Sequence, residues 1–327
     1  MNLFQNYLVE EFAEDYQEGH LSRRDALKLI FSVTGSMLVT NSILAACAPP
    51  PETTLAPATA TNAAATAAAT ATTAAAVAPS DTPQSTLSAV DPSAGPTEPT
   101  VETADIELPG EGATLLGALS RPAGADPRPV ILVCHENRGL TEHIKDVTRR
   151  LAAAGYVALA VDLLSRQGGT SSMSSDQVPG ILGNTAPEQF VSDFKSCWRY
   201  LGGQSFAQAG RVGMVGFCFG GGVTWQVATQ MPELLAAVPF YGPHPAVEAV
   251  ANIQAAVQAI YAGNDQRINQ GIPPIEEAML KNGKIYEKVI YPGVDHAFHN
   301  DTSSRYNAEA AQDAWRRTLA WFRKYVS

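Results

Sequence analysis

Basic residues are scarce in this sequence of 327 residues, which has 22 Lys and Arg against 32 Asp and Glu, a formal net charge of −10. Such a charge balance argues against nucleic acid or an anionic membrane surface as a partner. Cysteine is scarce as well, and no two of the four cysteines have CxxC spacing. A disulfide framework and a zinc site are therefore not expected, and no motif implies another metal or a cofactor.

Lysine and arginine are absent altogether from residues 48–120, and much of that stretch consists of Ala, Thr and Pro. It has no apolar face to bury, and the interleaved Thr and Pro oppose the helix that alanine alone would favour. We expect residues 48–103 to be a disordered tether. The chain then divides into residues 1–47, this tether, and a globular part at residues 104–327.

The first 47 residues contain features of a bacterial export signal. After a polar, acidic leader, Arg23 and Arg24 precede a moderately apolar stretch that ends in Leu-Ala-Ala-Cys at Cys47. Paired arginines before such a stretch match a twin-arginine signal, and its last four residues resemble a lipobox, in which the cysteine is acylated. The stretch is less apolar than a membrane-spanning helix, which needs about 20 strongly apolar residues. We expect an exported protein, anchored by lipid on Cys47 at the outer face of a bacterial membrane; an N-terminal anchor helix that is never cleaved is the alternative.

The globular part alternates short β-like runs with amphipathic segments, a pattern typical of an α/β fold. Residues 130–134 and 156–161 are continuous apolar runs, as expected of strands covered on both faces. Residues 104–108 and 114–120 are predicted to be two antiparallel edge strands. The other predicted strands are 211–215, 236–241, 256–261 and 284–290, and the predicted helices are 141–154, 188–201, 219–229, 274–282 and 307–325. We expect a mainly parallel twisted sheet covered by helices on both faces, with the functional site at the carboxyl ends of its strands.

Cys218 lies in the pattern Gly-x-Cys-x-Gly-Gly, residues 216–221, between a predicted strand and a predicted helix. This is the nucleophile-elbow pattern of α/β hydrolases with cysteine in place of serine. The bend is so tight that the residues two before and two after the nucleophile must lack side chains. The free N–H groups of the following helix favour a thiolate, and the Phe219 amide is placed to stabilise an oxyanion. The alternative is a buried structural cysteine, the role expected for Cys134 and Cys197.

A thiol nucleophile needs a base, and the base needs a group that orients it. In this fold the acid and the histidine follow the nucleophile in that order, each after a later strand. Asp265 follows the strand predicted at 256–261, and His296 lies on the loop before the last helix. Taken singly, the first would be a turn residue and the second a surface residue. Asp295 is the rival acid, but its side chain should point away from the adjacent histidine, and His299 is expected to be solvated.

These motifs resemble those of the dienelactone hydrolases (carboxymethylenebutenolidases), and the resemblance extends over residues 104–327. Residues 216–221 resemble that family's cysteine elbow, and residues 134–140 and 162–167 resemble two other shared segments. The resemblance implies an α/β-hydrolase fold and a triad of Cys218, Asp265 and His296. It also implies that Glu136 takes part in forming the thiolate when substrate binds, and that the backbone amide of Asn137 is the second oxyanion donor. Without the resemblance, Glu136 would be a solvated loop carboxylate.

One position departs from the family pattern. Members that act on dienelactone bind the substrate carboxylate with arginines, one of them four residues after the catalytic histidine, and that position is Asn300 here. Asp301 adds negative charge beside it, and neither Arg138 nor Arg166 can be assigned to replace the missing arginine. The resemblance therefore supports the chemistry better than it supports the identity of the substrate.

The sequence as a whole predicts a monomeric hydrolase that cleaves a small carboxylic ester or enol-lactone by way of a thioester acyl-enzyme on Cys218. Two alternatives stay open. One is a broad-specificity carboxylesterase or acyl transferase that uses the same triad. The other is a tethered binding domain without catalytic activity.

Overall fold

The computed structural model describes residues 1–46 and 100–327, which form one compact unit. Cys47 and the predicted tether up to residue 99 lie outside the described residues. The first strand begins at Val101, three residues before the predicted start of the globular part, because Val101 to Thr103 pair with Ser120 to Pro122.

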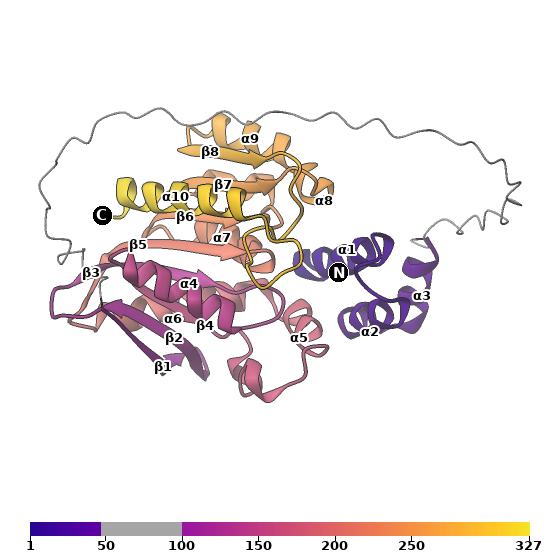
Figure 1. The fold of residues 1–327 in the computed structure, drawn as a ribbon, viewed down its shortest axis with the longest axis horizontal. Helices are drawn as coiled ribbons and strands as arrows, with labels where there is room; N and C mark the ends of the chain where they lie inside the picture. Colours follow the sequence, from indigo (N-terminus) through magenta and orange to yellow (C-terminus); the bar gives the residue numbers. More distant parts are fainter. Residues whose placement is uncertain (47–99) are drawn as a thin grey trace, which may run out of the picture. The chain divides into compact units, whose positions relative to one another are not determined.

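An eight-stranded sheet in the order β1-β2-β4-β3-β5-β6-β7-β8 forms the centre of the fold (Figure 1). The first two pairings along this order, β1 with β2 and β2 with β4, are antiparallel, whereas β4 and β3 and all later pairs are parallel. The strands are β1 Val101–Gly110, β2 Ala113–Pro122, β3 Arg128–Cys134, β4 Val157–Val161, β5 Ala207–Phe217, β6 Leu234–Phe240, β7 Ala256–Ala262 and β8 Tyr286–Tyr291. The predicted α/β class is confirmed, but β2 is an internal strand, since its second side pairs with β4.

Helices cover both faces of the sheet, with α4 and α10 on the near face in Figure 1 and α6 and α7 on the far face. The helices of this part of the chain are α4 Glu142–Ala153, α5 Val178–Asn184, α6 Pro187–Gly202, α7 Phe219–Gln230, α8 Gln266–Asn269, α9 Ile272–Lys281 and α10 Ala308–Tyr325. In α10 the buried positions recur at three- and four-residue steps, which gives the helix one apolar stripe toward the sheet. Asn307 caps its start by accepting a hydrogen bond from the Ala310 amide at 3.1 Å.

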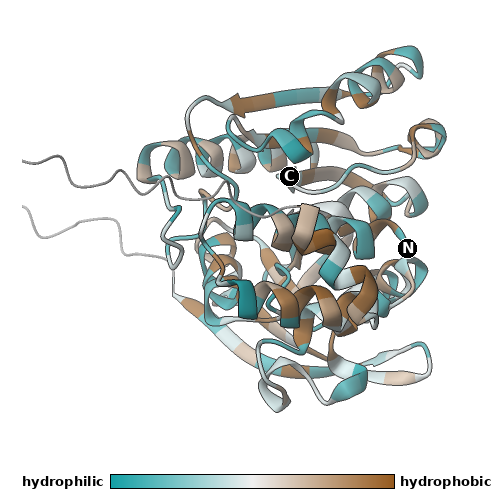
Figure 2. Cartoon of the chain, turned by 90° about the vertical axis from the view of Figure 1, so that its right-hand side faces the viewer, coloured by the Kyte–Doolittle hydropathy of each residue, from teal (hydrophilic) through white to brown (hydrophobic). Residues whose placement is uncertain are grey.

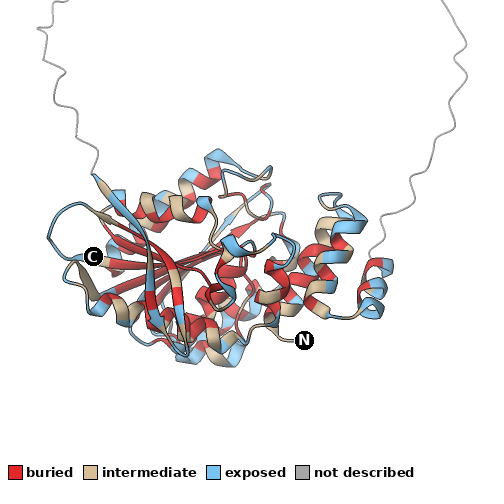
Figure 3. Cartoon of the chain, turned by 90° about the horizontal axis from the view of Figure 1, so that it is seen from below, coloured by how far each residue is buried: buried red, intermediate tan, exposed pale blue. Residues whose placement is uncertain are grey.

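The core lies between the sheet and its helices. β4 is buried along its whole length, and so is β3 from Val130 onward, which explains why both read as continuous apolar runs in the sequence. Figure 3 shows the central strands in red and the outer helix faces in blue. This packing fixes the carboxyl ends of β3, β5 and β7, where the candidate residues lie.

Three further helices precede Cys47: α1 Leu3–Gln17, α2 Arg23–Thr34 and α3 Met37–Ala46. Local signals mark the ends of these helices, since a capping box between Asn2 and Gln5 starts α1 and Gly35, with φ 64°, ends α2. The helices near the N-terminus in Figure 2 carry both apolar and hydrophilic residues. α1 packs on α2, α5 and α7, so the residues interpreted as a polar leader form a helix on the domain surface.

Aromatic contacts hold α1 against the domain. The Phe4 ring is fully buried and lies with its centroid 5.5 Å from Phe190 and 4.6 Å from Phe219. None of the helices formed by residues 1–46 and 100–327 has the length and apolar character that crossing a membrane requires.

Candidate active site

Cys218 lies in a sharp bend between β5 and α7, and its backbone has φ 58° and ψ −121°. Such a positive φ is costly for a residue with a side chain and persists only where the surroundings impose it. The flanking glycines make the bend possible: a Cβ on Gly216 would lie 2.1 Å from the Gly220 carbonyl oxygen, and one on Gly220 would lie 2.5 Å from the His135 carbonyl oxygen. The structure thus contains the elbow that the glycine pattern predicts.

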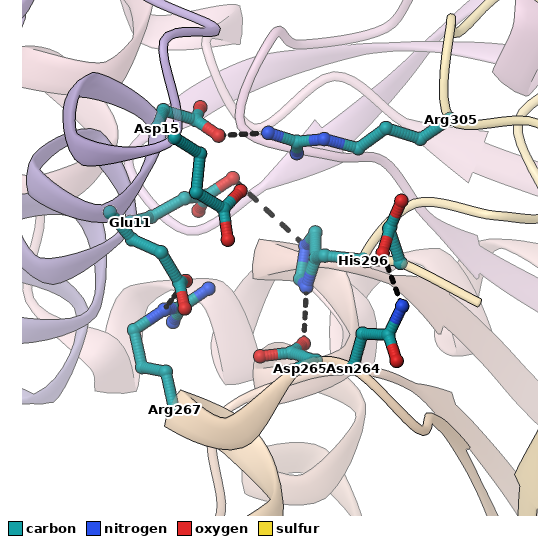
Figure 4. A pocket seen from close by; sticks show the side chains of 10 residues that line it. Glu11, Asp15, Asn264, Asp265, Arg267, His296 and Arg305 are labelled. Carbon is teal, nitrogen blue, oxygen red and sulfur yellow. Dashed lines mark hydrogen bonds and ion pairs between the residues drawn. The ribbon is translucent and has the colours of Figure 1, made fainter. Parts of the chain in front are cut away.

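His296 and Asp265 meet above this bend, although 31 residues separate them in the sequence. The Nδ1 atom of His296 lies 2.6 Å from Oδ2 of Asp265. Asp265 lies three residues after the carboxyl end of β7 and caps α8, where its other oxygen accepts a hydrogen bond from the Ile268 amide at 3.2 Å. The rival acid Asp295 is exposed and accepts a hydrogen bond from Asn264 instead, as expected from its position beside the histidine (Figure 4).

His296 and Asp265 each shift the pKa of the other. Burial by itself would lower the pKa of His296, but the Asp265 carboxylate and the nearby thiol together raise that pKa well above its usual value. Burial would raise the pKa of Asp265, yet the facing imidazole lowers it below its usual value. The arrangement therefore stabilises the imidazolium that His296 becomes after it takes a proton from a nucleophile.

The sulfur of Cys218 lies within 4.8 Å of an imidazole nitrogen of His296. A side chain from α1 lies beside both: the Tyr7 hydroxyl is 3.1 Å from Sγ and 3.4 Å from Nε2. The thiol also donates to the carboxylate of Glu11, with sulfur–oxygen distances of 3.6 and 3.8 Å. The three residues predicted to form the triad thus lie together, and α1 covers them.

The surroundings keep the thiol protonated. Burial raises the pKa of Cys218, the Glu11 carboxylate raises it further, and His296 opposes both. The N-terminus of α7 favours the thiolate, as the sequence predicts, but here it acts against a buried site with a negative charge beside the sulfur.

Glu136 and Asn137 follow β3 and lie in the same cavity as Cys218, which has a volume of about 430 Å³. Glu136 is buried, so the solvated alternative is wrong, and its Oε2 accepts a hydrogen bond from Asn300 at 2.8 Å. Burial raises the pKa of this carboxyl, with His143 and His296 opposing the shift. In this structure the carboxylate that contacts the sulfur belongs to Glu11 and not to Glu136.

The oxyanion donors implied by the sequence lie at the site. Phe219 is the first residue of α7, whose first N–H groups have no acceptor within the helix. Asn137 is buried at the cavity, and its side-chain amide donates to Glu11 at 3.1 Å. One wall of the cavity and the thiol are therefore both tied to the same residue of α1.

Two of the arginines considered from the sequence have different surroundings. Arg166 makes a two-pronged ion pair with Asp193, at 2.8 and 2.9 Å, and is committed to the fold. Arg138 is exposed and lines the cavity, as does Arg305. The charge of Asp301 is directed elsewhere, since it pairs with Arg150 and with His143.

The structure corrects one expectation and confirms another. His299 is buried rather than solvated: its ring stacks on Phe217 at 5.0 Å, and burial lowers the pKa of this histidine to about 3. Cys134 and Cys197 are buried free thiols of the core, as predicted.

Sequence reasoning missed two groups of residues at the site. Tyr241 has φ 35°, and its ring lies 4.8 Å from that of His296; no motif marks it. Tyr7 and Glu11 belong to α1, and the signal that could have revealed them is the four-residue spacing of Phe4, Leu8 and Phe12, an amphipathic pattern typical of a packed helix.

Glu11, Cys218 and His296 also place one possible ligand atom each within 4.8 Å of one another. Carboxylate, thiolate and imidazole are the ligands that Zn²⁺ takes in proteins. The Tyr7 hydroxyl contacts two of the three atoms, so hydrogen bonds also link this cluster.

Comparisons with known proteins agree with this geometry. Residues 115–326 match the model of the dienelactone hydrolase family. A predicted carboxymethylenebutenolidase of Methylorubrum extorquens is 37% identical over 68% of this chain and 80% of its own length, and one of Escherichia coli K12 is 31% identical over 72% and 94%. A crystal structure of a predicted dienelactone hydrolase from Klebsiella pneumoniae, 30% identical, aligns with a TM-score of 0.65 over 69% of this chain and all of its own. The chain belongs to the dienelactone hydrolase family and has the α/β-hydrolase fold of its structural neighbours.

Proposed function

We propose that this member of the family cleaves a carboxylic ester or enol-lactone by way of a thioester on Cys218, with His296 and Asp265 as its partners. One observation carries the proposal: a strained elbow presents the sulfur to an imidazole whose far nitrogen lies 2.6 Å from a buried carboxylate. A structural cysteine in a packing contact would need neither the positive φ nor this oriented histidine.

In the first half of the reaction, Sγ attacks the carbonyl carbon while the thiol proton passes to Nε2 of His296. The oxyanion that forms is stabilised by the backbone amides of Phe219 and Asn137. When the tetrahedral intermediate collapses, the carbon–oxygen bond to the leaving group breaks and the imidazolium returns the proton to that oxygen. Family resemblance adds Glu136 as a second group for the thiol proton.

In the second half, Nε2 takes a proton from a water molecule, and the hydroxide formed attacks the thioester carbonyl. The carbon–sulfur bond then breaks, the proton returns to sulfur, and the carboxylic acid leaves. Asp265 holds the imidazole in one orientation and stabilises its charged form throughout, so that one histidine can serve both halves.

The cavity supports a small-molecule substrate. A volume of about 430 Å³ lies within the range of ligand pockets, roughly 300–1,000 Å³. Asn300, which stands where family members acting on dienelactone have an arginine, donates to Glu136 and thereby orients that carboxylate. Arg305 is the cation that lines the cavity on the same loop, nine positions after His296.

The test is to trap the acyl-enzyme. Because α1 covers the site, the full chain with Phe4→Asp, which disturbs the buried aromatic contact of that helix, is incubated with p-nitrophenyl esters and with lactones. In this background Cys218→Ala is compared with Cys197→Ala, which removes a core thiol. We expect the first variant to lose hydrolysis by about 10⁵-fold or more and to form no adduct in the intact mass spectrum. Hydrolysis that survives in Cys218→Ala would overturn the proposal.

We also propose that residues 1–47 direct export and that Cys47 is acylated. In support, Arg23 and Arg24 are exposed at the start of α2, where a receptor can reach them. The test is to express the chain in a bacterium with a twin-arginine pathway and to weigh the mature protein. We expect a chain that begins at an acylated Cys47, and an uncleaved cytoplasmic chain from the double variant Arg23→Lys, Arg24→Lys. A mature wild-type protein that retains Met1 would support the uncleaved alternative.

A further inference from the structure

We propose that α1 is an internal inhibitor, which closes the active site by occupying the positions that substrate and water need at Cys218 and His296. The inference rests on the proposed function, because it assigns α1 an effect on that same site. It follows from three observations, namely the position of Tyr7, the position of Glu11 and the anchors that hold α1, together with the proposed cleavage site.

Tyr7 blocks the chemistry sterically. Its hydroxyl lies 3.1 Å from Sγ and 3.4 Å from Nε2, so it bridges nucleophile and base. The leaving-group oxygen and later the attacking water must each come within hydrogen-bond reach of that same nitrogen, about 2.6–3.2 Å. Neither can do so while the phenol is in place, and only 4% of Cys218 is exposed.

Glu11 opposes the chemistry electrostatically. Its carboxylate contacts the thiol and adds to burial in raising the pKa of Cys218, so the nucleophilic thiolate is disfavoured. The same carboxylate accepts the side-chain amide of Asn137 at 3.1 Å and lies 4.0 Å from Nε2 of His296. One residue of α1 thus contacts the nucleophile, the base and a residue of the expected oxyanion site.

Complementary charge anchors the helix. α1 has four carboxylates and no basic residue, and two of them face arginines of the domain. Glu14 accepts from Arg267 at 3.0 Å, and Asp15 pairs with Arg305 (Figure 4). Arg267 also lies over the Tyr7 ring, 4.7 Å from its centroid, and on this side α1 leaves a cavity of only about 20 Å³.

These contacts are noncovalent, and all of them depend on residues that precede the predicted cleavage site. Cleavage before Cys47 would separate α1, α2 and α3 from the chain that contains the triad. The 430 Å³ cavity would then lose the wall made by Glu11, Phe12 and Asp15 and open toward solvent. Export and activation would in this way be coupled: the enzyme stays closed until its signal is removed.

The test releases α1 in the full chain with two variants of opposite charge. Phe4→Asp places a carboxylate in the aromatic contact, and Glu14→Arg places a cation against Arg267. Their controls are Leu38→Asp, at an exposed position of α3, and Glu10→Arg, at an exposed position of α1. Hydrogen–deuterium exchange of residues 3–17 reports release, and EDTA is present throughout to exclude a bound metal.

Two readouts separate this inference from the proposed function. Iodoacetamide labelling of Cys218, followed by peptide mass, measures access to the thiol, and ester hydrolysis measures catalysis. We expect at least about 10-fold faster labelling in both release variants, despite their opposite charges, and wild-type rates in both controls. Both release variants should also hydrolyse the ester faster than the wild-type chain does. Faster labelling without hydrolysis would leave the closure standing and remove the proposed function.

Three results would overturn the proposal that α1 is an internal inhibitor. The first is faster exchange of α1 without faster labelling of Cys218. The second is an α1 that stays protected in both release variants, since the anchors would then not hold it. The third is a lower rate of hydrolysis by Tyr7→Ala with its thiol more accessible, because Tyr7 would then assist catalysis.

Discussion

Two parts of the chain surround Cys218, and each places a polar group close to the sulfur, with opposite consequences for the thiol. The hydrolase domain supplies His296, which lowers the pKa of the thiol, whereas α1 supplies Glu11, which raises it. The domain side lies within the part that matches the family model, residues 115–326, and α1 lies outside it. Proximity to a nucleophile is therefore no sufficient sign of a catalytic group; the sign of the charge and the space left for substrate decide.

The largest effect that could break this comparison comes from the acid on the domain side. Asp265→Asn should lower kcat by about 10³- to 10⁴-fold, because an amide no longer stabilises the imidazolium of His296. Asp295→Asn is the matched control and should have nearly wild-type activity, since that side chain contacts Asn264. Steady-state kinetics on the Phe4→Asp background measures both. Equal losses would mean that Asp265 is not the orienting acid.

A second comparison concerns stability, because the domain side of the site is built into the backbone and α1 is only packed on it. Gly216→Ala should lower the free energy of unfolding by about 3 kcal/mol, since its Cβ would lie 2.1 Å from the Gly220 carbonyl oxygen. Gly210→Ala, on the same strand, meets no atom within 4 Å and should change it by less than about 0.5 kcal/mol. Urea denaturation measures the difference, and a stable Gly216→Ala protein would argue against the elbow.

The smallest effect concerns the pH dependence of the thiol. A negative charge and burial both raise the pKa of Cys218. Glu11→Gln removes the charge, so that pKa should fall and the thiolate should form at lower pH. The curve of iodoacetamide labelling rate against pH should therefore move to lower pH, with severalfold faster labelling near neutrality. Glu10→Gln, at an exposed position of α1, should leave the curve in place; a shift of equal size there would indicate a general charge effect.

Much of the fold could be predicted from the sequence, because its signals are local or periodic. The fully buried runs at β3 and β4 follow from their continuous apolar residues, and the elbow follows from Gly216 and Gly220 on either side of Cys218. Asp265 and His296 could be selected as partners of Cys218 because each follows a later strand, in the order that the topology of the fold requires. By contrast, the position of β2 inside the sheet depends on its pairing with β4, which no local pattern encodes.

Other features could not be predicted because they depend on contacts between residues that are far apart in the sequence. His299 was expected in solvent, yet Phe217 from a distant strand covers its ring. Asn300 was noted only for the arginine it replaces, whereas its side chain orients Glu136, 164 positions earlier in the chain. The acidic residues of α1 read as a polar leader, because nothing near them in sequence shows that Arg267 and Arg305 face them.

The sequence by itself determined the chemistry available to this protein: a thiol in a bend that only flanking glycines allow, followed by a carboxylate and an imidazole in the order of this fold. Tertiary structure alone decided what lies against that thiol. Tyr7 and Glu11 are 211 and 207 positions away from Cys218, and contacts over such separations depend on how helices pack on a sheet. Periodicity can show that α1 has a face to bury, but only the folded chain shows that this face lies on the active site.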